Sequence, residues 1–219
     1  MAGDARSAVD QTTIPLAGSS SAARAATHQR SGAIILARHG EPAISRHVRL
    51  SAAEYAAWWA RYEETGLRDG QAVPAGLVTA AQGAAAILSS TRKRAIESAR
   101  LVADGLGFET DPDLIEAPLP PPHWPGWIRL SPRIWGTVSR AWWWLFNFHD
   151  GQESRAQAEH RADLVADRLE AKAALGGAVL VVAHGWFNRM IGASLQRRGW
   201  KLTENQGYRY WSLRRFELN

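Results

Sequence analysis

The sequence predicts an α/β protein built as a three-layer sandwich, in which a mostly parallel central sheet lies between helices. Two short aliphatic runs indicate buried strands, because each ends in a turn: Ala33–Ala37 and Val179–Ala183. Segments with helical spacing lie between these runs, as expected when helices connect the strands of such a sheet. A chain of 219 residues with 46% hydrophobic content suits one domain with a sizeable core.

The composition limits the class of protein. No run of about eighteen or more apolar residues occurs, so we do not expect a membrane-spanning helix. The absence of cysteine excludes disulfides and thiolate metal sites. The net charge of +5 favours an anionic partner such as a phosphate, a nucleic acid or an acidic membrane face.

Residues 1–30 have the composition of a disordered tail, rich in Ala, Ser, Gly and Arg and without periodicity. They lack the apolar core of a secretory signal, so we expect a cytoplasmic protein whose folded domain covers residues 31–219. An organelle-targeting peptide is the alternative for this segment, although Asp4 and Asp10 weigh against it.

The most informative feature is Arg38-His39-Gly40, which follows the first predicted strand directly. Ligands of such sheets collect at the carboxyl ends of the strands. The planar fork of Arg38 suits a pair of phosphate oxygens, and the imidazole of His39 can act as a nucleophile. Gly40 would let a backbone amide approach a ligand closely.

A helix is predicted to begin at Ser51, because Ser51 and Glu54 have the spacing of a capping box. Gly66 is a stop signal, so the helix should run to about Thr65. Four aromatic residues share one face of this helix: Tyr55, Trp58, Trp59 and Tyr62. We interpret this stripe as part of the core, and the alternative is that it forms a wall of a substrate site.

A third apolar run, Ala84–Leu88, predicts another strand, and Ser89–Ala95 places cations where that strand ends. A helix from Arg94 to about Gly105 should follow and pack its apolar face on the sheet. Residues 117–149 then form a Trp- and Pro-rich insertion, which holds six of the eleven tryptophans. We weigh three interpretations of this cap: an extra core against the Ser51 helix, a cap that shapes substrate choice, and contact with a membrane or a lipid-like substrate.

The last third of the chain predicts a helix from Glu153 to about Leu175, then the strand that leads to His184-Gly185. A helix from about Trp186 to Arg198 would direct its N-terminus, with its free amides, at the same site and favour an anion there. Residues 208–218 predict a last strand at a sheet edge, because of their arginines.

Together these motifs resemble the histidine phosphatase superfamily, also called the phosphoglycerate mutase-like family. The resemblance covers roughly residues 32 to 217, and its segments stand in the family's order: Arg38-His39-Gly40, Ser89 to Ala95, Leu114-Ile115-Glu116, Gly151 to Ser154, and His184-Gly185.

The resemblance implies phosphoryl transfer without a metal or another cofactor. His39 would be the nucleophile and form a phosphohistidine, and nearby guanidiniums would keep its imidazole neutral. Arg38 and Arg94 would bind the non-bridging oxygens of the phosphoryl group, while His184 and the Gly185 amide would add hydrogen-bond donors.

Glu116 is the candidate that protonates the leaving oxygen and later activates water, because a dianionic phosphate beside a carboxyl favours its protonated form. Glu153 is a second acidic candidate, which we interpret instead as a helix cap because it opens a helix. Arg46 and Arg49 follow the first motif, and the sequence assigns them no role.

The sequence departs from the family pattern at two places, and the extended substrate loops of the mutase branch are not recognisable, which favours a phosphatase over a mutase. Pro42–Ser45 replaces the family's Thr or Ser and Asn after the first motif, and the family's L-T-x-x-G-x-x-Q-A helix has no counterpart in the stretch 70–85. We therefore predict a metal-independent phosphomonoesterase of the histidine acid phosphatase type that acts on a phosphorylated small molecule. The alternatives are mutase-type phosphoryl transfer and a phospho-ligand binding protein without turnover. No nucleic-acid motif occurs, so no nucleic-acid partner is expected.

Overall fold

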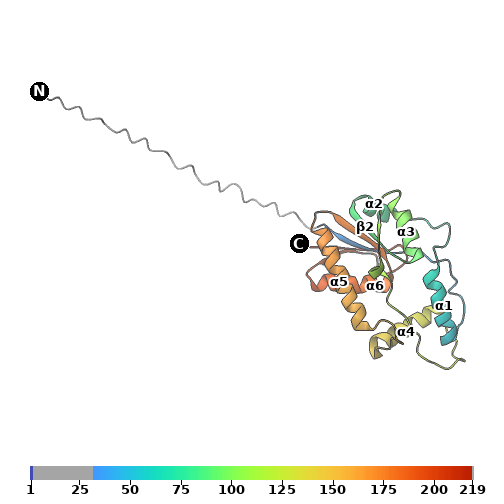
Figure 1. The fold of residues 1–219 in the computed structure, drawn as a ribbon. Helices are drawn as coiled ribbons and strands as arrows, with labels where there is room; N and C mark the ends of the chain where they lie inside the picture. The colour runs from blue at the N-terminus through green and yellow to red at the C-terminus, as the bar shows by residue number, and fades with distance from the viewer. Residues whose placement is uncertain (2–31, 219) are drawn as a thin grey trace.

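A computed structural model describes residues 1 and 32–218 of the chain (Figure 1). The predicted tail, apart from Met1, lies outside the described residues. The elements follow the chain in this order: β1 Ile34–Arg38, α1 Ala52–Glu64, α2 Ala75–Gln82, β2 Ala84–Ser90, α3 Lys93–Ala103, β3 Glu109–Asp111, the 3-10 helix η2 Pro112–Leu114, α4 Pro132–Phe146, α5 Arg155–Ala173, β4 Ala178–Ala183, α6 Gly185–Arg197, β5 Lys201–Asn205 and β6 Leu213–Glu217.

The strands form one six-stranded mixed sheet in the order β3-β2-β4-β1-β6-β5. The first four are parallel to one another, whereas β6 is antiparallel to β1 and β5 is antiparallel to β6. The predicted C-terminal strand is therefore β6, and its expected place at a sheet edge was wrong. Residues 201–205 supply β5, which covers β6, while the turn before β6 takes up Tyr208 to Trp211.

Helices cover both faces of the sheet, which gives the three layers that the sequence predicts (Figure 1). Successive residues of β1 point to opposite faces, as in any strand. Ile35 packs in a core with residues of α2 and α3, and Ile34 packs in a second core with residues of α5 and α6. The helix α2 lies in the stretch 70–85, so the conclusion that no helix precedes the second arginine motif was wrong: the family's sequence pattern is missing there, but a helix is present.

A third, smaller core joins α1 to α4, the helix of the Trp-rich insertion, at one end of the sheet (Figure 1). The capping box of Ser51 and Glu54 is present at the start of α1, as predicted. The Trp135 ring is fully buried between α4 and α1, where it stacks on Tyr55 at a centroid distance of 5.8 Å. Its indole N–H donates to the Leu50 carbonyl at 2.6 Å, so the insertion is hydrogen-bonded to the segment just before α1.

The insertion also reaches the main core through Trp143, which is fully buried and donates its indole N–H to the Glu153 carbonyl at 3.0 Å. The interpretation of the Trp-rich segment as an extra core against the Ser51 helix is therefore confirmed for Trp135, whereas Trp143 is buried in the main core instead. The helix end beyond them is different, because Leu145 and Phe146 are exposed. Contact of this end with a membrane stays a prediction. Within the part of the chain that the structure describes, no helix combines the length and the apolar content that crossing a membrane requires.

Candidate active site

The two strand-end histidines meet because their strands are neighbours in register. Arg38 pairs with Ala183 at the end of the parallel β1–β4 ladder, and the amide of His39 donates to the Ala183 carbonyl at 3.0 Å. The next residue of each strand is a histidine, and the ring centroids of His39 and His184 lie 5.1 Å apart. The strand β2 ends beside them, where the Ser90 hydroxyl lies 2.9 Å from Nε2 of His184.

The partners of His39 define which ring nitrogen carries the proton. Nδ1 lies 2.6 Å from the Gly40 carbonyl oxygen, which can only accept, so Nδ1 carries the hydrogen. Nε2 is then unprotonated, and its lone pair accepts the Nε–H of Arg94 at 3.3 Å. This is the tautomer in which Nε2 is the basic nitrogen.

Arg94 is completely buried and links both histidines to α1. Its Nη2 donates to Nδ1 of His184 at 3.2 Å and to the carboxylate of Glu63 at 2.9 Å, while Nη1 donates to the Tyr62 carbonyl at 2.9 Å. Since a guanidinium only donates, Nδ1 of His184 accepts and its Nε2–H is directed at Ser90. His184 is thus an acceptor toward Arg94 here, and its predicted role as a donor to a phosphoryl group stays a prediction.

Burial and positive charge keep both imidazoles neutral. Burial, followed by the charges of Arg94 and Arg38, holds the pKa of His39 well below its ordinary value of 6.5. Burial and the charge of Arg94 also hold the pKa of His184 well below 6.5. An uncharged imidazole with a free lone pair is the form that can attack an electrophile at neutral pH.

Arg38 extends from the end of β1 toward the open side of the site. Its Nη1 donates to the Tyr208 carbonyl at 2.6 Å, and its Nε is buried without a hydrogen-bond partner. The Gly185 backbone lies against this side chain, since a Cβ on Gly185 would stand 3.3 Å from the Arg38 Nε. Arg38 and Gly185 are therefore brought together, as predicted.

Gly40 has a structural role that the sequence did not indicate. A Cβ at this position would lie 2.3 Å from the Trp211 ring, so only glycine fits. Its amide donates to the Ser98 hydroxyl at 2.9 Å, and that hydroxyl donates to the Arg94 carbonyl at 2.6 Å. Ser98 therefore fixes the turn after His39 to the helix that carries Arg94.

Glu116 lies at the N-terminus of α6. Its carboxylate accepts from the amides of Phe187 at 2.8 Å and Trp186 at 3.2 Å. The free helix amides that were expected to bind a ligand anion instead hold this side chain. Arg161 anchors the segment before Glu116, because its Nη1 donates to the carbonyls of Asp113 and Ile115.

Glu153 is not the cap of α5, so that interpretation was wrong. Ser154 is the N-cap and forms a capping box with Gln157. The carboxylate of Glu153 instead forms two hydrogen bonds of 2.7 Å with Arg161, the residue that anchors the segment before Glu116. No role was predicted for Arg161 from the sequence, because its pairing with Glu153 belongs to no recognised motif.

The comparison with known families agrees with this geometry. A family model described as the histidine phosphatase superfamily (branch 1) matches residues 34–219.

The chain belongs to the histidine phosphatase superfamily.

Solved structures that resemble this chain include three mycobacterial proteins. "Mycobacterial hydrolase 1" is 21% identical with a TM-score of 0.52 and covers 76% of this chain and 79% of its own. "Mycobacterial hydrolase 2" is 24% identical with a TM-score of 0.52 and covers 77% of this chain and 73% of its own. A mycobacterial glucosyl-3-phosphoglycerate phosphatase is 22% identical, with a TM-score of 0.49, and covers 77% and 81% of the two chains. A sequence comparison with curated proteins finds no match.

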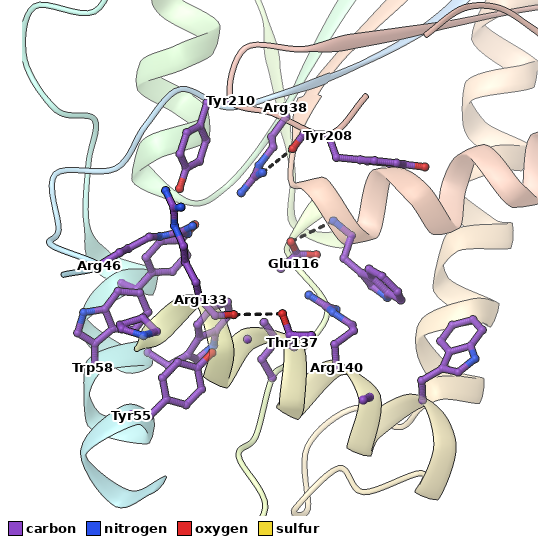
Figure 2. Close-up of a pocket in the computed structure, with 18 of the residues that line it drawn as sticks. Arg38, Arg46, Tyr55, Trp58, Glu116, Arg133, Thr137, Arg140, Tyr208 and Tyr210 are labelled. Atoms are coloured by element: carbon purple, nitrogen blue, oxygen red, sulfur yellow. Dashed lines mark hydrogen bonds between the residues drawn. The ribbon is translucent and has the colours of Figure 1, made fainter. Parts of the chain in front are cut away.

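Membership in the histidine phosphatase superfamily supports a phosphatase or phosphoryl-transfer activity. A large pocket opens at Arg38, the residue before His39 (Figure 2). The pocket has a volume of about 1030 Å³, and Arg38 and Glu116 line it together with residues of α1 and α4. The insertion therefore forms part of the pocket wall, as one interpretation of the sequence expected. His39, Arg94 and His184 do not line the pocket and are at most 1% exposed.

Two tyrosines of the pocket wall lie next to the buried His39 and Arg94. Tyr210 lines the pocket, and its ring centroid lies 5.7 Å from that of His39. Tyr62 also lines the pocket, and the Arg94 guanidinium lies 4.4 Å over its ring. Arg46 contacts both rings, with its guanidinium 5.4 Å from Tyr62 and 5.5 Å from Tyr210. Arg46, Tyr62 and Tyr210 therefore form the part of the pocket wall that is nearest to His39 and Arg94.

The sequence did not assign Tyr210, Glu63 or Arg46 to the site. Tyr210 belongs to a turn and Glu63 to the last turn of a helix, so neither has a neighbouring motif that would reveal its role. Among the residues that the structure describes, no group of three or more histidine and acidic side chains is placed to hold a metal ion.

Proposed function

We propose that this protein is a metal-independent phosphomonoesterase that works through a phosphohistidine formed on Nε2 of His39. The observation that carries the proposal is the tautomer of His39, whose Nδ1–H donates to Gly40 while Nε2 keeps its lone pair. The lowered pKa of His39 supports the same role, because a protonated ring could not attack phosphorus.

In the first step Nε2 of His39 attacks phosphorus, and the bond from phosphorus to the alcohol oxygen breaks. Arg38 and Arg94 stabilise the non-bridging oxygens, for which their planar forks are suited. The dianionic phosphate of the bound substrate favours the protonated form of Glu116, which then supplies the proton that the leaving oxygen takes up. Neutral His184 can donate from Nδ1 to a phosphoryl oxygen in its other tautomer, with Nε2 accepting from the Ser90 hydroxyl, and the Gly185 amide adds another donor.

In the second step Glu116, now a carboxylate, takes a proton from water, and the water oxygen attacks the phosphohistidine. The P–N bond breaks, so inorganic phosphate leaves and His39 is restored. The substrate is a phosphorylated small molecule that enters through the pocket of Figure 2. Because the centre is buried, substrate entry requires movement of the side chains of Tyr62, Glu63 or Tyr210.

The test is turnover of 4-nitrophenyl phosphate by the full chain, with and without a chelator of divalent ions. The proposal predicts release of phosphate that a chelator leaves unchanged and that His39→Ala abolishes. Binding of phosphate without turnover would instead support the phospho-ligand binding protein. Transfer of phosphate to an added acceptor in place of water would support the mutase-type alternative.

A further inference from the structure

The pocket beside the centre carries more positive charge than one phosphoryl group requires. Five arginines line it against a single carboxylate, that of Glu116; they are Arg38, Arg46, Arg133, Arg140 and Arg209. None of these five forms an ion pair with any carboxylate of the described residues, whereas the neighbouring Arg92, Arg94 and Arg161 all do. A cluster of unpaired cations around a cavity is the electrostatic pattern of a site for an anionic ligand.

Arg140, on α4, has a buried guanidinium nitrogen, Nη1, without a hydrogen-bond partner, and it has no ion pair among the described residues. Its guanidinium lies 4.3 Å over the ring of Trp186. Burial lowers the pKa of Arg140 to about 10, so the group stays charged at neutral pH. A buried charge without a partner destabilises a fold, so packing alone does not account for it.

The position of Arg140 separates it from the phosphoryl site. Figure 2 shows Arg38 and Tyr210 on one side of the pocket and Arg140 on α4 on the other side, with Glu116 between them. The charge of Glu116 acts on Arg140 from a distance, but no hydrogen bond or ion pair joins them, and the Glu116 carboxylate is held by the amides of α6. Aromatic rings of α1, including Tyr55 and Trp58, form the apolar wall of the same cavity.

We propose that Arg140 is the centre of a second anion subsite, which binds a carboxylate or a second phosphate at the far end of the substrate. This inference rests on the proposed phosphatase activity and names its substrate class: phosphomonoesters with a second anionic group and an apolar body between the two. Arg133 lines the same cavity two helical turns before Arg140 and adds positive charge on the same side of α4. The Trp-rich insertion thereby sets substrate choice through a charge as well as through its rings.

The test uses matched aryl phosphates whose far ends differ only in charge. The pairs are 4-carboxyphenyl phosphate and 4-carbamoylphenyl phosphate, and the same pair extended by one or two methylene groups before the carboxyl or amide. For each pair the readout is the ratio of kcat/KM for the acid to kcat/KM for the amide. We compare the wild type with Arg140→Met, with Arg140→Lys, and with Arg100→Met, an exposed arginine of α3 that does not line the pocket.

A hydrogen bond to a charged group corresponds to roughly a 10- to 100-fold preference for the acid at the best spacing. The proposal predicts that Arg140→Met reduces this ratio to near one, that Arg140→Lys restores part of it, and that Arg100→Met leaves it unchanged. The proposal is overturned if no pair shows a preference in the wild type. Equal losses on acid and amide in Arg140→Met would also overturn it, because they would assign Arg140 to the transferred phosphoryl group or to Glu116.

A binding experiment separates this inference from the proposed catalysis. Calorimetric titration of the His39→Ala variant, with and without Arg140→Met, measures the affinity for the same ligands without turnover. Tighter binding of the acid than of the amide that depends on Arg140 supports the subsite even if the chain hydrolyses neither. Absence of turnover by the wild type together with such binding would contradict the proposed function alone. Equal affinities for acid and amide would contradict the subsite alone.

Discussion

Nε of Arg94 lies 3.3 Å from Nε2 of His39, so one guanidinium N–H occupies the lone pair that we propose attacks phosphorus. The remaining nitrogens of Arg94 contact His184, Glu63 and the end of α1. In this structure, protein groups therefore occupy the hydrogen-bonding positions of Arg94 and His39. An incoming phosphoryl group has to replace some of these hydrogen bonds. The first two predictions concern this exchange.

Arg94→Lys should severely impair catalysis although it keeps the charge. Lysine presents a single ammonium and cannot hold both histidines and a phosphoryl oxygen pair as the planar fork does. We expect kcat/KM for 4-nitrophenyl phosphate to fall by roughly 10²- to 10³-fold, the range for loss of one preorganised donor. Arg100→Lys, on the exposed face of α3, is the matched control. Activity of Arg94→Lys within a factor of two of the wild type would show that the fork has no such role.

Glu63→Gln should tighten the binding of inorganic phosphate. The Glu63 carboxylate lies 2.9 Å from Nη2 of Arg94 and 2.7 Å from Nε of Arg92, where it competes with a phosphoryl group for the same cations. Removal of this competing charge should improve the binding free energy of phosphate by about 1 kcal/mol, which corresponds to roughly five-fold stronger inhibition. Glu64→Gln, the exposed neighbour, should leave the inhibition constant unchanged. Weaker inhibition in Glu63→Gln would mean that Glu63 positions Arg94 and does not compete with phosphate.

The sequence predicts the centre better than its surroundings. Each strand that ends beside the centre is a short aliphatic run followed directly by the residue of interest, and parallel pairing brings those ends to one edge of the sheet. The positions of Arg38, His39, Arg94 and His184 therefore follow from local pattern and from topology. The capping box of Ser51 is equally local, and the structure confirms it.

The features that the sequence missed depend on long-range packing. Tyr210 and Glu63 reach the centre from a turn and from a helix end, and Arg140 becomes a pocket residue only because α4 packs on α1. The order of the last two strands was missed because β5 is mostly exposed and polar, which hides it from a search for apolar runs. Gly40 was assigned to a ligand because the sequence cannot show that the Trp211 ring lies against it.

Glu116→Gln should discriminate between leaving groups. If Glu116 protonates the leaving oxygen, an alkyl phosphate with a poor leaving group should lose roughly 10²- to 10⁴-fold in kcat. 4-Nitrophenyl phosphate should lose less, because its leaving group needs little protonation. Measurement of kcat for both substrates in the same variant gives the answer. Equal losses on the two substrates would assign Glu116 a positioning role at the start of α6 and contradict its role as the acid.

The neutral histidines make stability depend on pH. The folded pKa values of His39 and His184 lie well below 6.5, whereas in the unfolded chain each imidazole takes up a proton below about pH 6.5. Their contribution to stability is therefore present above this pH and is lost as the pH falls through it. The free energy of unfolding in urea should drop between pH 7.5 and 5.5 by about 1 kcal/mol more in the wild type than in His184→Gln. The control is His160→Gln, an exposed position that should behave like the wild type. If the free energy of unfolding drops as much in His184→Gln as in the wild type, His184 is protonated in the folded state.

The central claim is that His39 carries the phosphoryl group, and trapping of the phosphoenzyme tests it most directly. Wild-type protein mixed with a ³²P-labelled substrate and quenched within milliseconds should contain a phosphoprotein that is labile in acid and stable in base, with the label on His39 after proteolysis. A burst of alcohol release should accompany it when hydrolysis of the phosphohistidine is slow. His39→Ala should show neither the label nor turnover. A His39→Ala protein with near-normal turnover, or a label on another residue, would contradict the account.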